Sequence, residues 1–191
     1  MSESTRTAVG DNRGDDLRLA GEVARDAQRY LATLHAVAYG VTGAQSVPLL
    51  LLDVAQVCVA AAHLSARTDV VLDDNPGPGD TEPPDVDALR EGLAAALDSA
   101  DAYAEVFDPY DAGELVRMRL SDDLADIAVD LLTGLAHYEA GRSREALWWW
   151  QYTCLNSWGM SAGAALRALQ SLVAHARLDA GQEPLPADVA D

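Results

Sequence analysis

The amino-acid sequence predicts an all-α protein, a single-domain bundle of about five to six helices around a central tryptophan-rich helix. Apolar residues recur at helical spacing along most of the chain, and no stretch alternates between apolar and polar residues as a half-buried strand does. Of the 191 residues, 49% are hydrophobic, which suits one compact core. One helix is expected to be central to the packing, because a single segment holds all the tryptophans, Trp148, Trp149, Trp150 and Trp158.

Both ends of the chain and one internal loop are expected to lie outside this bundle. Residues 1–15 are polar and contain no apolar run, which predicts a disordered leader and not a signal peptide. Residues 68–84 are rich in Pro, Gly and Asp, which predicts a mobile acidic loop. Residues 179–191 predict an acidic tail. The helical domain is therefore expected over residues 16–178.

Two helices are expected in the N-terminal part of the domain. The first carries an apolar stripe over residues 20–38 and ends at Gly40. The second begins at Ser46, whose hydroxyl suits a helix start, with Pro48 in the first turn where no amide donor is needed. It is expected to continue to about Arg67.

A sparse polar stripe interrupts this second helix. Its apolar run over residues 47–64 is long enough to span a membrane, but Asp53, Gln56 and His63 break it, so we expect a buried helix and no membrane. The three residues follow helical spacing and share one side of the helix. Because buried polar groups need partners, they predict either a buried polar network or a pocket.

A third helix is expected over about residues 86–106, followed by a turn over residues 107–113, where Pro109 disfavours helix. Ser121 is expected to cap a fourth helix and Ser143 to cap the tryptophan helix. Gly159 and Gly163 predict a kink or a close helix contact before the last helix.

The fourth helix carries a run of aspartates. Asp122, Asp123 and Asp126 match the D-D-x-x-D pattern that holds magnesium in prenyl-diphosphate enzymes, and Asp122, Asp126 and Asp130 share one helix face. The chain lacks a second acidic motif and basic residues to hold the phosphates. Capping or solvated aspartates are therefore the favoured interpretation, with a metal site at Asp122, Asp126 and Asp130 as the alternative.

The tryptophan helix presents three faces. Leu147, Trp150, Cys154 and Trp158 form one stripe, and Trp148, Tyr152 and Leu155 form a second; both are expected to pack against neighbouring helices. The third face is the most polar and is expected to be exposed or to bind a partner. It consists of Trp149, Thr153 and Asn156.

The charged residues of the chain exclude several classes of catalytic and binding site. The formal net charge is -18, and all 13 cationic residues are arginine. The absence of lysine excludes a P-loop lysine, a Schiff-base lysine and a Ser-Lys dyad. The acidity also argues against direct binding to nucleic-acid phosphates. Cys58 and Cys154 are isolated thiols in apolar runs, so a reducing cytoplasm is the expected location.

The segments FDPYD, SDDLADIAVDLLTGLAHYEAG, EALWWWQYTCLNSWG and ALRAL, between Phe107 and Leu169, resemble the bacterial domain of unknown function 5063 family. The resemblance implies an all-helical fold and a cytoplasmic bacterial protein, and it implies no activity. Histidines are common in the family at the positions of Ser157 and Ser161, and a polar residue is usual at Trp149. Because this chain has serines at those two positions, the resemblance implies no role for histidine side chains there.

We therefore expect a non-catalytic helical protein that binds a protein partner, or a second copy of itself, around Trp149, and that uses no cofactor. Exposed aromatic side chains are the usual energetic anchors of interfaces. Two alternatives stay open. The first is a metal-dependent hydrolase of a phosphorylated or nucleotide substrate that uses Asp122, Asp126 and Asp130, and the second is an acidic mimic of nucleic acid.

Overall fold

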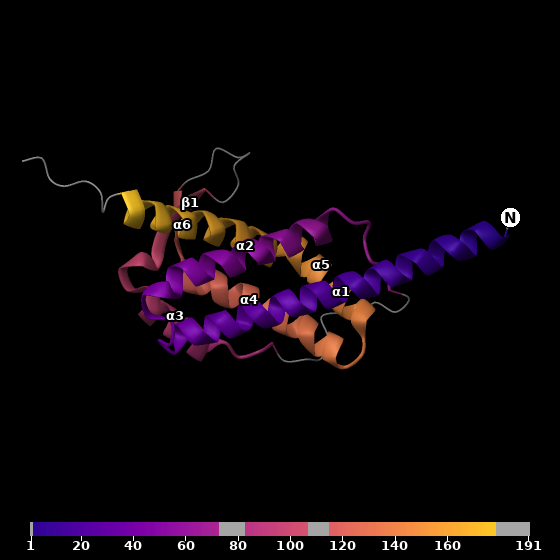
Figure 1. The fold of residues 1–191 in the computed structure, drawn as a ribbon, viewed down its shortest axis with the longest axis horizontal. Coiled ribbons are helices and arrows are strands. Elements are labelled where there is room, and N and C mark those ends of the chain that lie inside the picture. Colours follow the sequence, from indigo (N-terminus) through magenta and orange to yellow (C-terminus); the bar gives the residue numbers. More distant parts are fainter. Residues whose placement is uncertain (1, 73–82, 107–114, 179–191) are drawn as a thin grey trace, which may run out of the picture.

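The computed structural model describes residues 2–72, 83–106 and 115–178, with side chains from residue 13 onward. These residues form six α-helices and one two-stranded antiparallel sheet (Figure 1). The all-α prediction is confirmed, with one β-hairpin added to the bundle. The elements are α1 (Ser2–Ala38), α2 (Ser46–Ser65), α3 (Asp87–Leu97), β1 (Ala102–Val106), β2 (Leu115–Arg119), α4 (Leu120–Glu139), α5 (Ser143–Asn156) and α6 (Trp158–Leu178).

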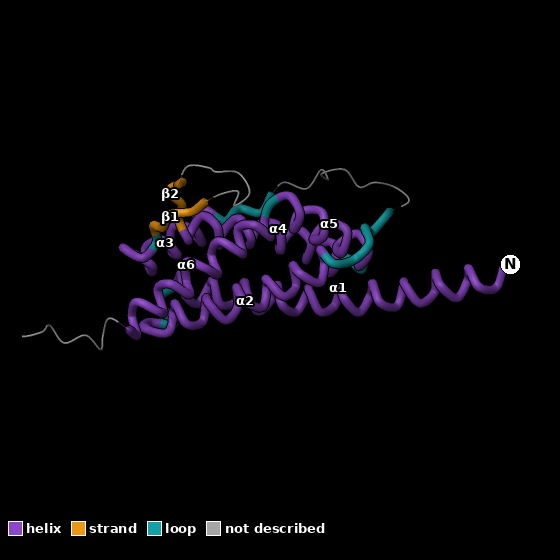
Figure 2. The backbone as a smooth tube through the Cα atoms, turned by 90° about the horizontal axis from the view of Figure 1, so that it is seen from above, coloured by secondary structure: helices purple, strands orange, loops and turns teal. Residues whose placement is uncertain are grey.

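The helices lie on two sides of the molecule. Figure 2 shows α1 and α2 along one side and α3, α4 and α5 along the other, with the hairpin of β1 and β2 at one end. Helix α6 packs beside α2 and also contacts α4 and α5. Helix α5 contacts α1, α2, α4 and α6, so the tryptophan helix has the central position that the sequence predicts.

The core forms where the apolar stripes of these helices meet. Burying a Leu, Val or Ile side chain contributes about 1.5–3 kcal/mol, so these stripes supply the main driving force for folding. Tyr30 of α1 is also fully buried, and its hydroxyl donates to the Leu124 carbonyl of α4 at 2.9 Å, which satisfies its polar end. The buried stripes include Val23, Ala27 and Leu34 of α1, Leu50, Val54, Val57 and Leu64 of α2, and Leu124, Ile127 and Leu131 of α4.

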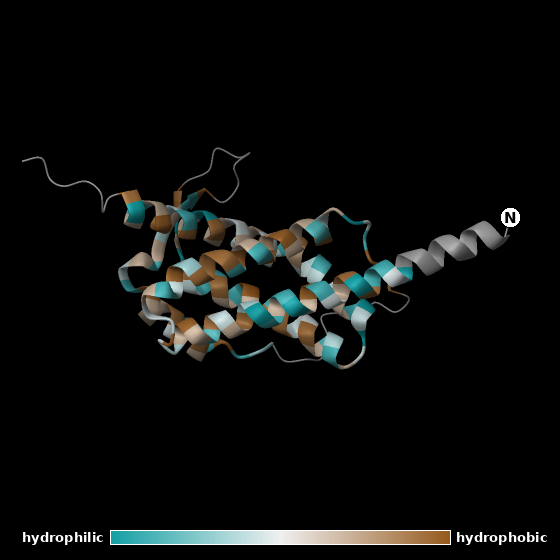
Figure 3. Ribbon diagram, in the orientation of Figure 1, coloured by the Kyte–Doolittle hydropathy of each residue, from teal (hydrophilic) through white to brown (hydrophobic). Residues whose placement is uncertain are grey.

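Helix α2 is apolar on its outer side as well. In Figure 3 the visible side of α1 is largely hydrophilic, whereas that of α2 carries several hydrophobic residues. Among the described residues, the helix Gly43–Ser65 is long and apolar enough to cross a membrane, a property that core helices share and that is weak evidence for a span. Helix α2 also packs against α1 and α6, which are the contacts of a core helix.

The ends of the predicted domain differ from the structure in one place. The sequence predicts a disordered leader over residues 1–15, whereas residues 2–15 are the first turns of α1, which extends beyond the bundle in Figure 1. The predicted mobile loop at 68–84 is described in part: Val70 is buried and its amide donates to Gln151 Oε1 at 2.8 Å. Residues 73–82 and the predicted tail at 179–191 lie outside the described residues.

The third helix is shorter than predicted and a hairpin follows it. Helix α3 ends at Leu97, and Asp98 has a positive φ of 49°, which turns the chain out of the helix. β1 then pairs with β2 from Ala102↔Arg119 to Val106↔Leu115. The prediction of no strand is therefore wrong, and the predicted turn at 107–113 falls outside the described residues.

Asp101, and not Ser121, caps α4. Ser121 lies inside the first turn of the helix. Its amide donates to Asp101 Oδ1 at 2.7 Å and its hydroxyl to Asp101 Oδ2 at 3.0 Å. The Leu120 amide donates to the Asp101 carbonyl at 2.8 Å, and Arg119 Nε donates to Asp101 Oδ2 at 2.8 Å. A carboxylate from before the hairpin thus accepts the free amide of the helix start.

The break between α5 and α6 follows from close packing. Ser157 leaves the helical conformation, with φ −146° and ψ −91°. A Cβ atom at Gly159 would lie 2.5 Å from the Cys154 carbonyl oxygen, so only glycine allows this approach. The close contact predicted at Gly159 is confirmed, whereas a Cβ atom at Gly163 would meet no atom within 4 Å, so the contact predicted there is wrong. Ser143, in contrast, is the first residue of α5, and the residue before it makes no side-chain cap.

Candidate functional site

Two of the four indoles are buried, Trp150 on the core side of α5 and Trp158 at the start of α6. Leu147, Trp150 and Cys154 are buried, together with Trp158 from the start of α6, so the stripe predicted for the core is confirmed. Each buried indole N–H finds a carbonyl: Trp150 donates to Leu131 and Trp158 to Trp150, both at 3.3 Å. Trp158 Nε1 also donates to Thr153 Oγ1 at 3.1 Å.

The face predicted to bind a partner is largely internal. Trp149 is half-buried, and its indole N–H donates to the Asp130 carbonyl at 3.2 Å, so it packs onto α4. Thr153 is only 7% exposed, because its hydroxyl donates to the Trp149 carbonyl and accepts from Trp158. Asn156 alone is exposed. The polar residues of this face predicted that it would contact solvent. The hydroxyl of Thr153 instead forms its hydrogen bonds inside the protein.

The second face of α5, predicted to pack inward, is the exposed one. Tyr152 and Leu155 are 54% and 57% exposed. Trp148 is half-buried, and its ring is stacked on Tyr152 with centroids 5.4 Å apart and planes 6° apart. We call Trp148, Tyr152 and Leu155 the α5 aromatic face. It is apolar, lies on a helix that the core holds in place, and has at its centre a ring pair in fixed orientation.

The aspartates of α4 face an arginine of α3. Asp122 Oδ1 and Asp126 Oδ1 lie 3.0 and 2.9 Å from Nη1 and Nη2 of Arg90, so two of the carboxylates proposed as metal ligands are ion-paired with an arginine. Asp130 is half-buried and lies near Ser157; burial raises its pKa, and the Ser157 hydrogen bond opposes that shift. Within the described part of the chain, no three His, Cys, Asp or Glu side chains are grouped to hold a metal ion.

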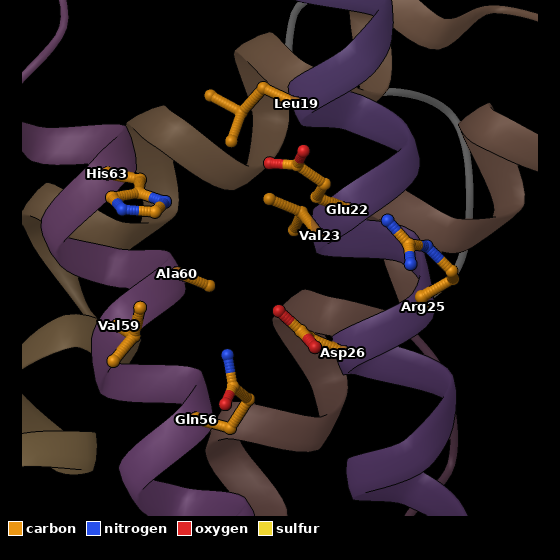
Figure 4. A pocket seen from close by; sticks show the side chains of 9 residues that line it. All are labelled: Leu19, Glu22, Val23, Arg25, Asp26, Gln56, Val59, Ala60 and His63. Carbon is orange, nitrogen blue, oxygen red and sulfur yellow. The ribbon is translucent and has the colours of Figure 1, made fainter.

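The polar stripe of α2 faces α1 and has two environments. Asp53, one of the three residues of the predicted network, is buried and accepts a hydrogen bond from Arg29 Nε at 2.7 Å. Gln56 and His63 instead line a pocket of about 270 Å³ between the two helices (Figure 4). The α1 side of that pocket carries Glu22, Arg25 and Asp26. The stripe therefore faces α1 and not the aspartates of α4.

A larger pocket lies between the hairpin and α6. It has a volume of about 500 Å³, within the range of small-molecule sites, and its walls are mainly apolar. Two buried carboxylates, Glu105 of β1 and Asp123 of α4, line it together with Arg167 of α6. Ser161, one of the two serines that replace family histidines, lines it as well.

The carboxylates of this pocket have distinct partners. The Tyr103 hydroxyl donates to Asp123 Oδ2 at 2.5 Å, and Arg167 donates to Glu105 Oε1. The pKa of Asp123 is raised to about 6, mainly by burial; the Tyr103 hydrogen bond opposes this shift, and the charges of Asp126, Asp122 and Glu105 add to it. Burial and the adjacent Asp123 also raise the pKa of Tyr103. A carboxyl group that titrates near neutral pH in a cavity is a mark of functional sites.

The sequence did not indicate this pocket. Its walls come from β1, β2, α4 and α6. The sequence predicted a helix over residues 86–106, so Tyr103 and Glu105 were placed on a helix and not on the strand that forms the pocket wall. One local signal was available: Tyr103 and Glu105 alternate with alanines, and a Pro- and Gly-containing segment separates them from Val116 and Met118. These are the marks of a hairpin.

Comparisons with known proteins bear on the fold and the family. The crystal structure of protein BF1032 from Bacteroides fragilis is similar to this chain, with a TM-score of 0.60 and 20% sequence identity over 86% of this chain and 93% of that one. At this identity the likeness concerns the fold alone. No curated protein matches the chain. Residues 16–175 match the family described as a domain of unknown function, DUF5063, and because the match covers most of the chain, this protein belongs to that family.

Proposed function

We propose that this protein is a non-catalytic helical binding protein that docks a basic partner protein on the α5 aromatic face. The observation that carries the proposal is the exposure of Tyr152 and Leu155 beside the stacked ring of Trp148. Large aromatic and aliphatic side chains grouped on one rigid helix are the usual anchors of protein interfaces.

The ring stack favours binding by reducing its entropic cost. A side chain that becomes immobile on association costs about 0.5–1.5 kcal/mol. Tyr152 already lies flat against Trp148, with planes 6° apart, and Trp148 packs against the core. Little freedom is therefore lost when a partner covers this pair, and the buried apolar area contributes to affinity.

The charge of the chain indicates a basic partner. Acidic residues outnumber arginines by 18 in the chain, and eight of the arginines in the described residues are ion-paired with carboxylates. A second copy of an equally acidic chain is repelled, whereas a basic partner is attracted. The eight are Arg18, Arg29, Arg67, Arg90, Arg119, Arg142, Arg144 and Arg167.

Two matched tyrosine variants test the proposal. Tyr152→Ala removes an exposed tyrosine stacked on Trp148, and Tyr39→Ala removes an exposed tyrosine stacked on His35, at the end of α1. Full-length wild-type and variant proteins are used to capture partners from the cell of origin, and each captured protein is then purified and titrated by calorimetry. We expect a basic protein whose affinity falls by about 30-fold or more with Tyr152→Ala, as for a central interface aromatic, and stays unchanged with Tyr39→Ala.

Salt and oligomeric state supply the contradicting outcomes. Affinity for a basic partner should weaken between 50 and 500 mM NaCl, because salt screens the attraction between the two proteins. Equal binding by both tyrosine variants would contradict a role for the α5 aromatic face. A homodimer in sedimentation equilibrium that Tyr152→Ala dissociates and Tyr39→Ala does not would show that a second copy, and not a basic partner, covers this face.

A further inference from the structure

The pocket between the hairpin and α6 combines apolar walls with an unbalanced buried charge. Its walls include Val106, Leu115, Met118, Met160 and Ala164, and its volume of about 500 Å³ holds a small organic molecule. Glu105 and Asp123 bring two carboxylates to it, and Arg167 brings one guanidinium. The pocket is therefore one positive charge short of neutral when both acids are ionised.

One carboxylate oxygen of this pocket lacks a partner. Arg167 donates to Oε1 of Glu105. The other oxygen, Oε2, accepts no hydrogen bond from the protein, and it cannot turn to solvent instead because it is buried and Glu105 is only 9% exposed. A buried acceptor without a donor is costly, so native proteins rarely leave one unpaired. Glu105 lines the pocket and the last torsion of a glutamate is soft, so a donor bound in the pocket is a source for the missing hydrogen bond.

The surroundings of Asp123 favour a cation at the same place. Glu105, Asp122 and Asp126 all act on Asp123 with negative charge, and Asp123 is itself buried. Arg90 donates hydrogen bonds to Asp122 and Asp126 and does not line the pocket. A donor with a positive charge at the pocket stabilises the ionised form of Asp123 and supplies the missing partner of Glu105.

We propose that this pocket binds a small organic amine, with its ammonium group between Glu105 and Asp123 and its alkyl or aryl body against Met118 and Met160. An ammonium group carries the required charge and three hydrogen-bond donors. The apolar walls take the body of the ligand and exclude water from the ion pair, which strengthens it. This site is separate from the α5 aromatic face, and neither proposal depends on the other.

Three probes of one shape test the chemistry. 2-Phenylethylamine, 2-phenylethanol and phenylacetate share an aromatic body and differ in the charge of the head group. Calorimetry on the full chain at pH 7.5 should give a dissociation constant below about 1 mM for the amine. We expect binding at least tenfold weaker for the alcohol and none for the acid. Equal affinity for amine and alcohol, or no amine binding below 1 mM, would overturn the proposal.

Variants locate the site. Glu105→Gln keeps the shape and removes the charge, so amine affinity should fall at least tenfold. Gly163 lines the pocket from α6, and a Cβ atom there meets no atom within 4 Å, so we expect Gly163→Leu to fold, to occupy pocket volume and to leave both acids in place. Glu22→Gln removes a carboxylate from the pocket between α1 and α2 and is the control for general attraction of the amine to an acidic protein. Amine affinity that Gly163→Leu leaves unchanged, or that Glu22→Gln lowers as much, would place the binding elsewhere.

Discussion

At the scale of single residues, two buried aspartates organise the junction between the hairpin and α4. Asp101 holds the start of the helix through Ser121 and the second strand through Arg119. Asp123, one turn into the helix, holds the first strand through Tyr103. The hairpin is attached to the bundle at both strands by carboxylates. Both are more than nine-tenths buried, so their removal acts on stability and not only on surface charge.

The Asp101→Ala variant should lose stability mainly through the helix start. It leaves the Ser121 amide and hydroxyl without an acceptor, and we expect a cost of about 2 kcal/mol, the upper range for a helix cap, because the site is buried. Urea denaturation measures this cost. Asp101→Asn, which keeps one acceptor oxygen, should cost less. An Asp101→Ala variant as stable as the wild type would show that Asp101 does not cap α4.

The Asp123→Asn variant should become relatively more stable as pH rises. The pKa of Asp123 is raised from 3.8 to about 6 in the folded chain. Between these values the folded state binds more protons than the unfolded state, so ionisation of Asp123 lowers stability as pH rises and does so fully above pH 6. Asparagine lacks this cost and still accepts a hydrogen bond from Tyr103. Relative to pH 3.5, the variant should gain about 1–2 kcal/mol on the wild type at pH 7.5. A pH-independent difference in urea denaturation would contradict the raised pKa.

At the scale of elements, α5 shows how far the sequence pattern determines the structure. Helical spacing correctly predicted that Leu147, Trp150 and Cys154 face the core. It did not distinguish the other two faces, because Thr153 satisfies its hydroxyl internally and leaves Tyr152 to the solvent. Composition marks which residues need partners, and only the packing decides where those partners are.

The hairpin was missed for a related reason. Residues 98–104 contain three alanines and one serine, small residues that fit a helix. The pairing of this segment with β2 depends on residues further along the chain. Because β1 carries Tyr103 and Glu105, the pocket that they line was missed with it. The caps were misplaced in the same way, since the acceptor for Ser121 comes from Asp101, which precedes the hairpin.

Two helix glycines should respond in opposite ways to alanine. A Cβ atom at Gly134 of α4 would lie 2.0 Å from Trp150 Nε1, so Gly134→Ala collides with a buried indole and should cost about 1–3 kcal/mol. Gly163→Ala in α6 meets open space and should gain up to about 1 kcal/mol from helix propensity. Thermal or urea unfolding separates the two. A neutral Gly134→Ala variant would show that the contact between α4 and α5 is looser than described.

At the scale of the whole molecule, arginines form ion pairs that join distant segments, and acidic residues in excess of the arginines give the protein its negative charge. Arg67 and Arg144 meet at Asp16, and Arg90 joins α3 to α4. Such ion pairs connect segments far apart in the sequence. The excess of acidic residues over arginines gives the molecule a net charge of -18. On this background the α5 aromatic face is an apolar surface on an acidic protein, which is why the partner proposed for it is basic.

Site-specific photo-crosslinking in the cell of origin tests this central proposal most directly. A photoreactive phenylalanine analogue replaces Leu155, on the α5 aromatic face, or Tyr39, an even more exposed residue at the end of α1. Only molecules within a few ångströms of the side chain are captured. We predict that position 155 yields one reproducible basic protein and that position 39 does not. The same adducts at both positions, or an adduct at 155 that is a second copy of the chain, would contradict the account.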